Sequence, residues 1–98
     1  MKPNNIHTPH LWVEFYESKR STITFKPIIL WEKSESYRDN DMPYIEMEGN
    51  LVNIDEAIKQ YGSIISFVPE SILKQTVKAI DKEREYTINV NGYGNIFD

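Results

Sequence analysis

Two histidines, His7 and His10, are the residues whose type and spacing most directly suggest chemistry, because imidazole can bind a metal or transfer a proton. They stand three residues apart, and a metal site would need a further ligand, for which Glu14 and Glu17 are the candidates. Pro9 works against the helical geometry that would place positions three apart on one face. We therefore expect two solvent-exposed histidines on a loose arm, with no metal and no cofactor.

No other pattern in the sequence indicates catalysis. The chain has no cysteine, which excludes disulfides, thiolate zinc sites and cysteine nucleophiles. Asp39, Asn40 and Asp41 lack the glycine and the later glutamate of a calcium loop, and residues 91–94, NGYG, lack the context of a phosphate-binding loop. An enzyme would need a base and a nucleophile or metal drawn from the histidines, scattered serines and carboxylates. We therefore expect a protein that is not an enzyme.

The elements that position the remaining side chains begin with a predicted β-hairpin. Residues 10–32 contain both tryptophans and two of the four phenylalanines. In residues 11–17 and again in residues 22–26, apolar side chains alternate with polar or amphipathic ones at the period of two that a strand requires. β-branched and aromatic residues in both runs favour strand over helix. Pro27 then marks an edge position or a bulge, because it cannot donate to a ladder.

The register of this hairpin follows from parity if each strand has one buried face. Opposed residues of an antiparallel pair share a face, so the two apolar sets align only when the loop has an odd number of residues. A five-residue loop at 17–21 pairs Phe15 with Ile23 and Val13 with Phe25. A three-residue loop would lack the glycine that such loops favour, so we predict the longer loop.

Periodicity and capping signals predict the later elements: a strand at 44–48, a helix at 53–61, a strand at 63–68, a helix from 69 to about 83, and a strand at 86–90. Asn53 and Glu56 form a capping box, and Gly62 stands where a helix of this length ends. Gly49 and Asn50 are predicted to turn the chain.

These elements predict one α+β domain spanning residues 1–98, with a loose N-terminal arm at 1–9 and an exposed acidic loop at 33–43. Its core would be a mainly antiparallel sheet of four to five strands with two helices packed on one face. The other face of the sheet would then have no helix to cover it.

That open face is the predicted binding surface. If the odd-numbered hairpin residues face the helices, the even-numbered ones and Lys26 are displayed on the other side, together with the outward residues of the strand at 44–48. Large aromatics mixed with carboxylates are typical of protein-binding surfaces. The predicted partner-binding residues are Trp12, Glu14, Tyr16, Tyr44, Glu46 and Glu48, with Asp39 and Asp41 from the acidic loop.

The charge distribution indicates the kind of partner. The net charge is −4, which argues against direct binding to nucleic acid. Residues 32–56 hold eight acidic and two basic residues, a local charge of −6. We therefore expect a small acidic, non-catalytic binding or inhibitor protein whose partner is a protein with a basic surface, and whose carboxylates mimic nucleic-acid phosphates.

The same general character is found in phage-encoded inhibitors of bacterial defence and in immunity proteins against nuclease toxins, although no motif here identifies either class. The abundance of isoleucine, lysine, asparagine and tyrosine is typical of AT-rich genomes, such as those of many Gram-positive bacteria and their phages. The N-terminal segment has no hydrophobic region, so we expect no signal peptide, no membrane span and a cytoplasmic protein.

Two other interpretations stay open at this point. A nucleotide or small-molecule binder would stack its ligand on Trp12, Trp31 or a tyrosine, with Arg20 or Arg38 supplying charge. A homodimeric structural module would use the aromatic open face as its subunit contact.

Overall fold

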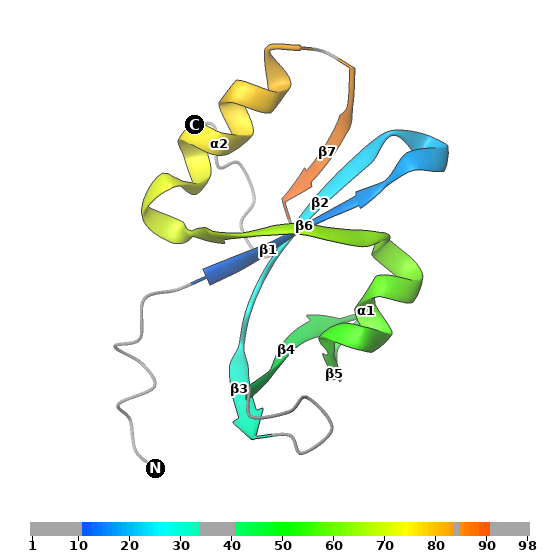
Figure 1. Ribbon diagram of the computed structural model, residues 1–98, viewed down its shortest axis with the longest axis vertical. Helices are drawn as coiled ribbons and strands as arrows, with labels where there is room; N and C mark the ends of the chain where they lie inside the picture. Colours follow the sequence, from blue (N-terminus) through cyan, green and yellow to red (C-terminus); the bar gives the residue numbers. More distant parts are fainter. Residues whose placement is uncertain (1–10, 34–40, 84, 91–98) are drawn as a thin grey trace.

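The computed structural model describes residues 11–33, 41–83 and 85–90, and its fold is α+β, as the sequence predicts (Figure 1). Its strands are β1 (Leu11–Glu17), β2 (Thr22–Pro27), β3 (Leu30–Lys33), β4 (Asp41–Met47), β5 (Asn50–Asn53), β6 (Ser63–Pro69) and β7 (Thr87–Val90), and its helices are α1 (Ile54–Tyr61) and α2 (Glu70–Asp81). The predicted arm at 1–9, both histidines, Asp39 and the segment 91–94 lie outside the described residues.

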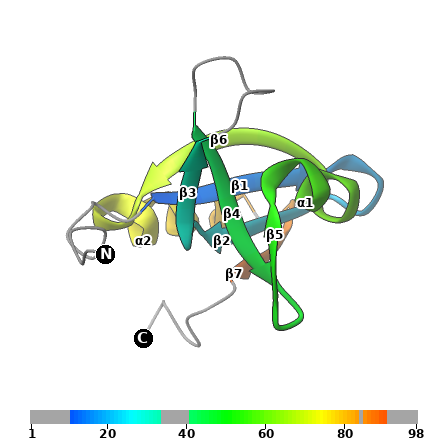
Figure 2. The same ribbon diagram turned by 90° about the horizontal axis from the view of Figure 1, so that it is seen from below.

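The strands form two sheets where the sequence predicted one. The larger sheet has the order β6-β1-β2-β7, in which β2 and β7 run parallel and the other neighbours antiparallel. The smaller sheet is antiparallel and has the order β3-β4-β5. The strand predicted at 44–48 is therefore part of a second layer, which crosses the larger sheet at an angle (Figure 2).

The hairpin register differs from the prediction by one residue. Phe15 pairs with Thr24 and Tyr16 pairs with Ile23, so the predicted pairing of Phe15 with Ile23 is wrong. The loop between the strands contains four residues, and it closes with Ser21 in the left-handed conformation at φ 48°. A one-residue shift moves a whole apolar set to the other face, so the odd-numbered apolar residues of β1 and of β2 lie on opposite faces of the sheet.

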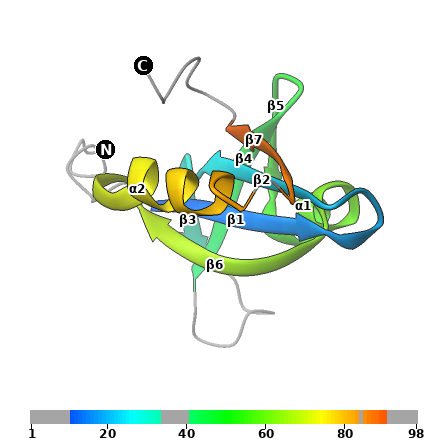
Figure 3. The same ribbon diagram turned by 90° about the horizontal axis from the view of Figure 1, so that it is seen from above.

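This register is favoured because the central strands β1 and β2 of the larger sheet are covered on both faces. On one face, α2 packs over a cluster formed by Trp12, Ile23, Phe25, Val68, Leu73 and Val77. On the other face, α1 and the smaller sheet cover a cluster formed by Val13, Phe15, Ile28, Met42, Ile45, Ile54 and Ala57. The two helices thus lie on opposite sides of the sheet, and the expectation of an uncovered face is wrong (Figures 1 and 3).

The local signals around α1 are confirmed. The Asn53 side chain caps the helix by accepting from the backbone N–H of Glu56 at 2.9 Å. Gly62 ends the helix at φ 103°, where its backbone N–H donates to the carbonyl of Ile58. The helix begins at Ile54 because Asn53, as its N-cap, has an extended backbone conformation. Asn53 is also the last residue of β5, a strand that the sequence did not predict.

Two further boundaries differ slightly from prediction. The turn between β4 and β5 consists of Glu48 and Gly49, both with positive φ (53° and 86°), and lies one residue earlier than expected. This is the conformation that favours a two-residue hairpin loop, and Glu46 supports it by accepting the backbone N–H of Gly49 at 2.7 Å. At α2, Pro69 precedes the helix in an extended conformation instead of occupying its first turn.

Replacing Gly62 by alanine should destabilise the fold strongly. An alanine would be strained at φ 103°, and its Cβ would collide with the carbonyl oxygen of Tyr16 in the central strand. We expect a loss of about 2 to 4 kcal/mol in the free energy of unfolding, measured by urea denaturation. Gly49→Ala is the control, because Gly49 also has a positive φ but has open space around it, and should lose only about 1 kcal/mol. Equal losses for the two variants would contradict this account.

Candidate functional site

The predicted partner-binding residues of β1 are covered by α2. Trp12 is fully buried, and its indole Nε1 donates to Glu70 Oε1 at 3.1 Å. Glu14 is only 7% exposed and accepts a hydrogen bond from the Ser66 hydroxyl at 2.8 Å. The predicted exposure of Trp12 and Glu14 is therefore wrong, because the one-residue shift in register allows a second core to form on their face of the sheet.

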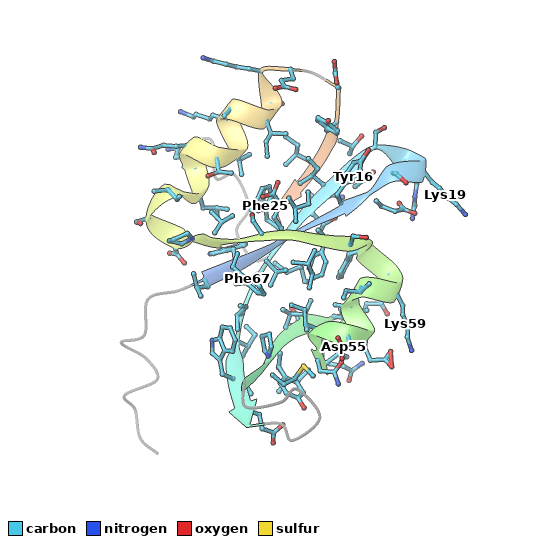
Figure 4. The ribbon with its side chains drawn as sticks, in the orientation of Figure 1. Tyr16, Lys19, Phe25, Asp55, Lys59 and Phe67 are labelled. Atoms are coloured by element: carbon cyan, nitrogen blue, oxygen red, sulfur yellow. The ribbon has the colours of Figure 1, made fainter. Side chains whose placement is uncertain are left out.

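Tyr16 is half-buried on the same side, where its ring meets that of Tyr86 edge to face at 5.9 Å (Figure 4). By contrast, Tyr44, Glu46 and Glu48 belong to β4 and its turn, in the layer on the opposite side of the larger sheet. The structure thus separates the predicted set into two groups that do not share a surface. Asp41 is the first residue of β4, and its side chain is not among those that the structure describes.

The second group is part of a continuous acidic layer. The smaller sheet and α1 contact each other, and together they contain the described part of the acidic segment 32–56. Its exposed carboxylates, which we call the acidic surface, are Glu32, Glu46, Glu48, Asp55 and Glu56. Lys59, one helical turn from Asp55 (Figure 4), is an exposed base on this layer, and it pairs with Glu56 at 3.3 Å.

The carboxylates of the acidic surface affect the pKa values of two nearby tyrosines, Tyr44 and Tyr61. A hydrogen bond from the Tyr44 hydroxyl to Glu32 raises the pKa of Tyr44, and partial burial and the charge of Glu32 act in the same direction. Burial raises the pKa of Tyr61, and the charges of Glu48 and Glu46 raise it further. The charges of Glu46 in β4 and Glu48 in the β4–β5 turn therefore act on Tyr61, the last residue of α1.

Lys26 lies between the two layers, where the sequence placed it on an open face. It is 5% exposed, and its Nζ is 5.8 Å from the centre of the Tyr61 ring. Burial lowers the pKa of Lys26, and the opposite charge of Glu46 offsets part of this effect. The alternation along β2 correctly placed Lys26 opposite Phe25, but no sequence signal indicated that a second sheet would cover that face.

Exposed apolar side chains lie beside the acidic surface. Leu51 is 48% exposed and is the cross-strand neighbour of Glu46. Trp31 precedes Glu32 on β3, and its ring lies 6.4 Å from that of Phe67 on β6. Trp31 was predicted only as a possible stacking residue for a nucleotide, and Phe67 was not among the predicted binding residues.

Two open pockets lie on opposite sides of the larger sheet. One, of about 390 Å³, lies between α2 and the sheet and has Glu14 in its lining. The other, of about 520 Å³, lies between the hairpin end, α1 and β7 and is lined largely by polar side chains, including the ion pair of Arg20 with Glu17 at 2.8 Å. Among the described residues, no group of three or more histidines or carboxylates is arranged to hold a metal ion.

Comparisons with protein-family models, with curated proteins and with solved structures found no match for this chain. Neither of the two described helices has the length and apolar character needed to cross a membrane. The charge and shape of the described surfaces are therefore the grounds on which a function can be proposed.

Replacing Lys26 by methionine should stabilise the protein at neutral pH. Burial favours the neutral amine, so the folded chain releases this proton at a lower pH than the unfolded chain, whose lysine titrates near 10.5. The free energy of unfolding of the wild-type protein therefore increases as the pH rises from the lowered pKa of Lys26 in the folded chain towards 10.5, its value in the unfolded chain. We expect Lys26→Met to melt at a higher temperature than wild type at pH 7, with the difference narrowing at alkaline pH.

The matched control is Lys78→Met, which removes the same charge from an exposed position on α2. Thermal unfolding of the three proteins, followed by circular dichroism from pH 7 to pH 10, measures the effect. An identical pH dependence of Lys26→Met and Lys78→Met would contradict the proposed burial of the charged amine.

Proposed function

We propose that this chain is a small acidic binding protein without catalysis, which acts by associating with another protein through the acidic surface. The observation that supports this proposal is that three elements, β3, β4 with its turn, and α1, bring five exposed carboxylates onto one layer. Lys59, an exposed base on that layer, is already paired with Glu56.

The apolar residues next to these carboxylates favour a protein partner over a simple ion. Protein interfaces combine buried aromatic or aliphatic anchors with a polar rim, and tryptophan is frequent among the anchors. Leu51 lies beside Glu46, and Trp31 lies beside Glu32 and against Phe67. The carboxylates would steer a basic partner to the surface, and the apolar side chains would stabilise the complex after contact.

The partner that best fits this chemistry is a protein with a basic surface, such as a nuclease or another nucleic-acid-binding protein. Carboxylates presented where phosphates would lie can occupy such a surface and exclude the nucleic acid. An inhibitor of this kind, encoded by a phage against bacterial defence, agrees with the composition of the chain, and this attribution rests on composition alone.

Neutralising the acidic surface should weaken this association. Glu48→Gln with Asp55→Asn removes two exposed charges without disturbing the carboxylates that support the β4–β5 turn or contact Tyr44. We expect a partner captured by the wild-type chain to bind the double variant at least tenfold more weakly, because each lost charge reduces attraction to a basic surface. Isothermal titration with the purified partner at two salt concentrations measures the loss.

The control double variant is Asp81→Asn with Glu85→Gln, which changes the net charge equally at exposed positions outside the acidic layer. It should bind as wild type does. A nucleic-acid duplex should compete with the wild-type chain for the partner, and added salt should weaken the complex steeply. The proposal fails if both double variants lose the same affinity or if binding is insensitive to salt.

A further inference from the structure

The pocket between α2 and the larger sheet has the chemical character of a site for an organic cation. Its volume of about 390 Å³ falls within the range of small-ligand sites. Its lining comes from four parts of the fold: Glu14 and Tyr16 of β1, Ile23 of β2, Ile65 of β6, and Ala79, Ile80, Glu83 and Tyr86 from α2 and the segment after it. Two of these side chains are carboxylates, and none is basic.

Glu14 is the group that gives the pocket its polarity. It is 7% exposed, and its described polar contact is the hydrogen bond that Oε1 accepts from the Ser66 hydroxyl. No ion pair with a basic side chain involves Glu14 in the part of the chain that the structure describes. A buried carboxylate that receives one neutral hydrogen bond is poorly compensated, so a cation that entered the pocket would restore the lost solvation.

The walls around Glu14 suit the uncharged part of such a ligand. Ile23, Ile65 and Ile80 supply aliphatic surface, and Ile65 is 52% exposed, so apolar area is available to an incoming group. The rings of Tyr16 and Tyr86 stand edge to face at 5.9 Å, and an aromatic face attracts a cation through its quadrupole. Glu83 adds a second negative charge to the lining.

We propose that this pocket binds an amine or guanidine with an apolar body, with Glu14 pairing with the positive group. This site is independent of the acidic surface, because α2 and the smaller sheet lie on opposite faces of the larger sheet. The cation comes either from a free amine or from a lysine or arginine side chain of another protein, and both sources share the chemistry that Glu14 recognises.

Titration with benzylamine and with benzyl alcohol tests the role of charge. The two probes have nearly the same size and shape, but only benzylamine is positively charged at pH 7. In ¹H–¹⁵N correlation spectra of the wild-type chain, we expect benzylamine to shift the amide signals of Glu14, Ile65 and Ile80 in a saturable manner. Its Kd should be at least tenfold lower than that of benzyl alcohol.

The second arm identifies the source of the cation. Acetyl-Gly-Arg-Gly-amide and acetyl-Gly-Lys-Gly-amide are titrated under the same conditions. If either peptide binds more tightly than benzylamine at the same amides, the pocket receives a protein side chain. If benzylamine binds more tightly than both peptides, the ligand is a free amine. Either result supports the proposed chemistry.

Three variants locate the binding. Glu14→Gln keeps an acceptor for the Ser66 hydroxyl but removes the charge. It should weaken the binding of benzylamine at least tenfold and leave the affinity for benzyl alcohol unchanged. Glu85→Gln removes a charge from an exposed position outside the pocket lining and should bind as wild type does. Ala79→Leu fills the pocket from an exposed helix position, so it should block both probes even if Glu14→Gln does not fold.

The proposal is overturned if benzylamine causes no saturable shifts at these amides, or if benzyl alcohol binds as tightly as benzylamine. It is also overturned if a folded Glu14→Gln variant retains full affinity for benzylamine, or if Ala79→Leu does. Because these measurements use no protein partner, their failure would leave the proposal for the acidic surface unaffected.

Discussion

The burial of β1 on both faces, complete or nearly so from Trp12 to Phe15, is the constraint on which the structure depends. Trp12 points into the core under α2, while Val13 and Phe15 point into the core under α1 and the smaller sheet. The strand also pairs with β2 on one edge and with β6 on the other, so its backbone and side chains are enclosed together. A chain of 98 residues therefore builds two small clusters around one strand, and both helices and most of the other strands contribute to one of them.

Double burial determines how charges on the central strands are accommodated. Glu14 and Lys26 lie on neighbouring strands, but their side chains point to opposite faces, so they cannot neutralise each other. Lys26 lies over the Tyr61 ring and is attracted by the charge of Glu46, whereas Glu14, among the described residues, accepts a hydrogen bond from the Ser66 hydroxyl and forms no ion pair. The buried charges of Lys26 and Glu14 are thus compensated unequally, and Glu14, the less compensated of the two, lines a pocket.

Sequence signals that act over a few residues predicted the fold well. The Asn53 cap, the end of α1 at Gly62 and the strand at β6 were predictable because capping geometry and apolar runs are local properties. The hairpin register was not, because parity determines it only when one face is buried. The four residues of β5 are too few to show a periodic pattern, so the sequence did not predict the smaller sheet. Without that sheet, the burial of Lys26 could not be predicted either. The concentration of acidic residues was visible, but Trp12 and Glu14 were assigned to the wrong environment.

The larger sheet also separates charge in a way that the net value of −4 conceals. The exposed side of α2 carries Lys74 and Lys78 among its acidic residues, whereas the layer across the sheet presents five exposed carboxylates and, among the side chains that the structure describes, one exposed base. Like charges gathered on so small a layer repel one another and disfavour the compact state. An exposed arrangement of this kind contributes nothing to the two cores, since those are apolar. A basic partner of the kind proposed above would relieve this repulsion on binding.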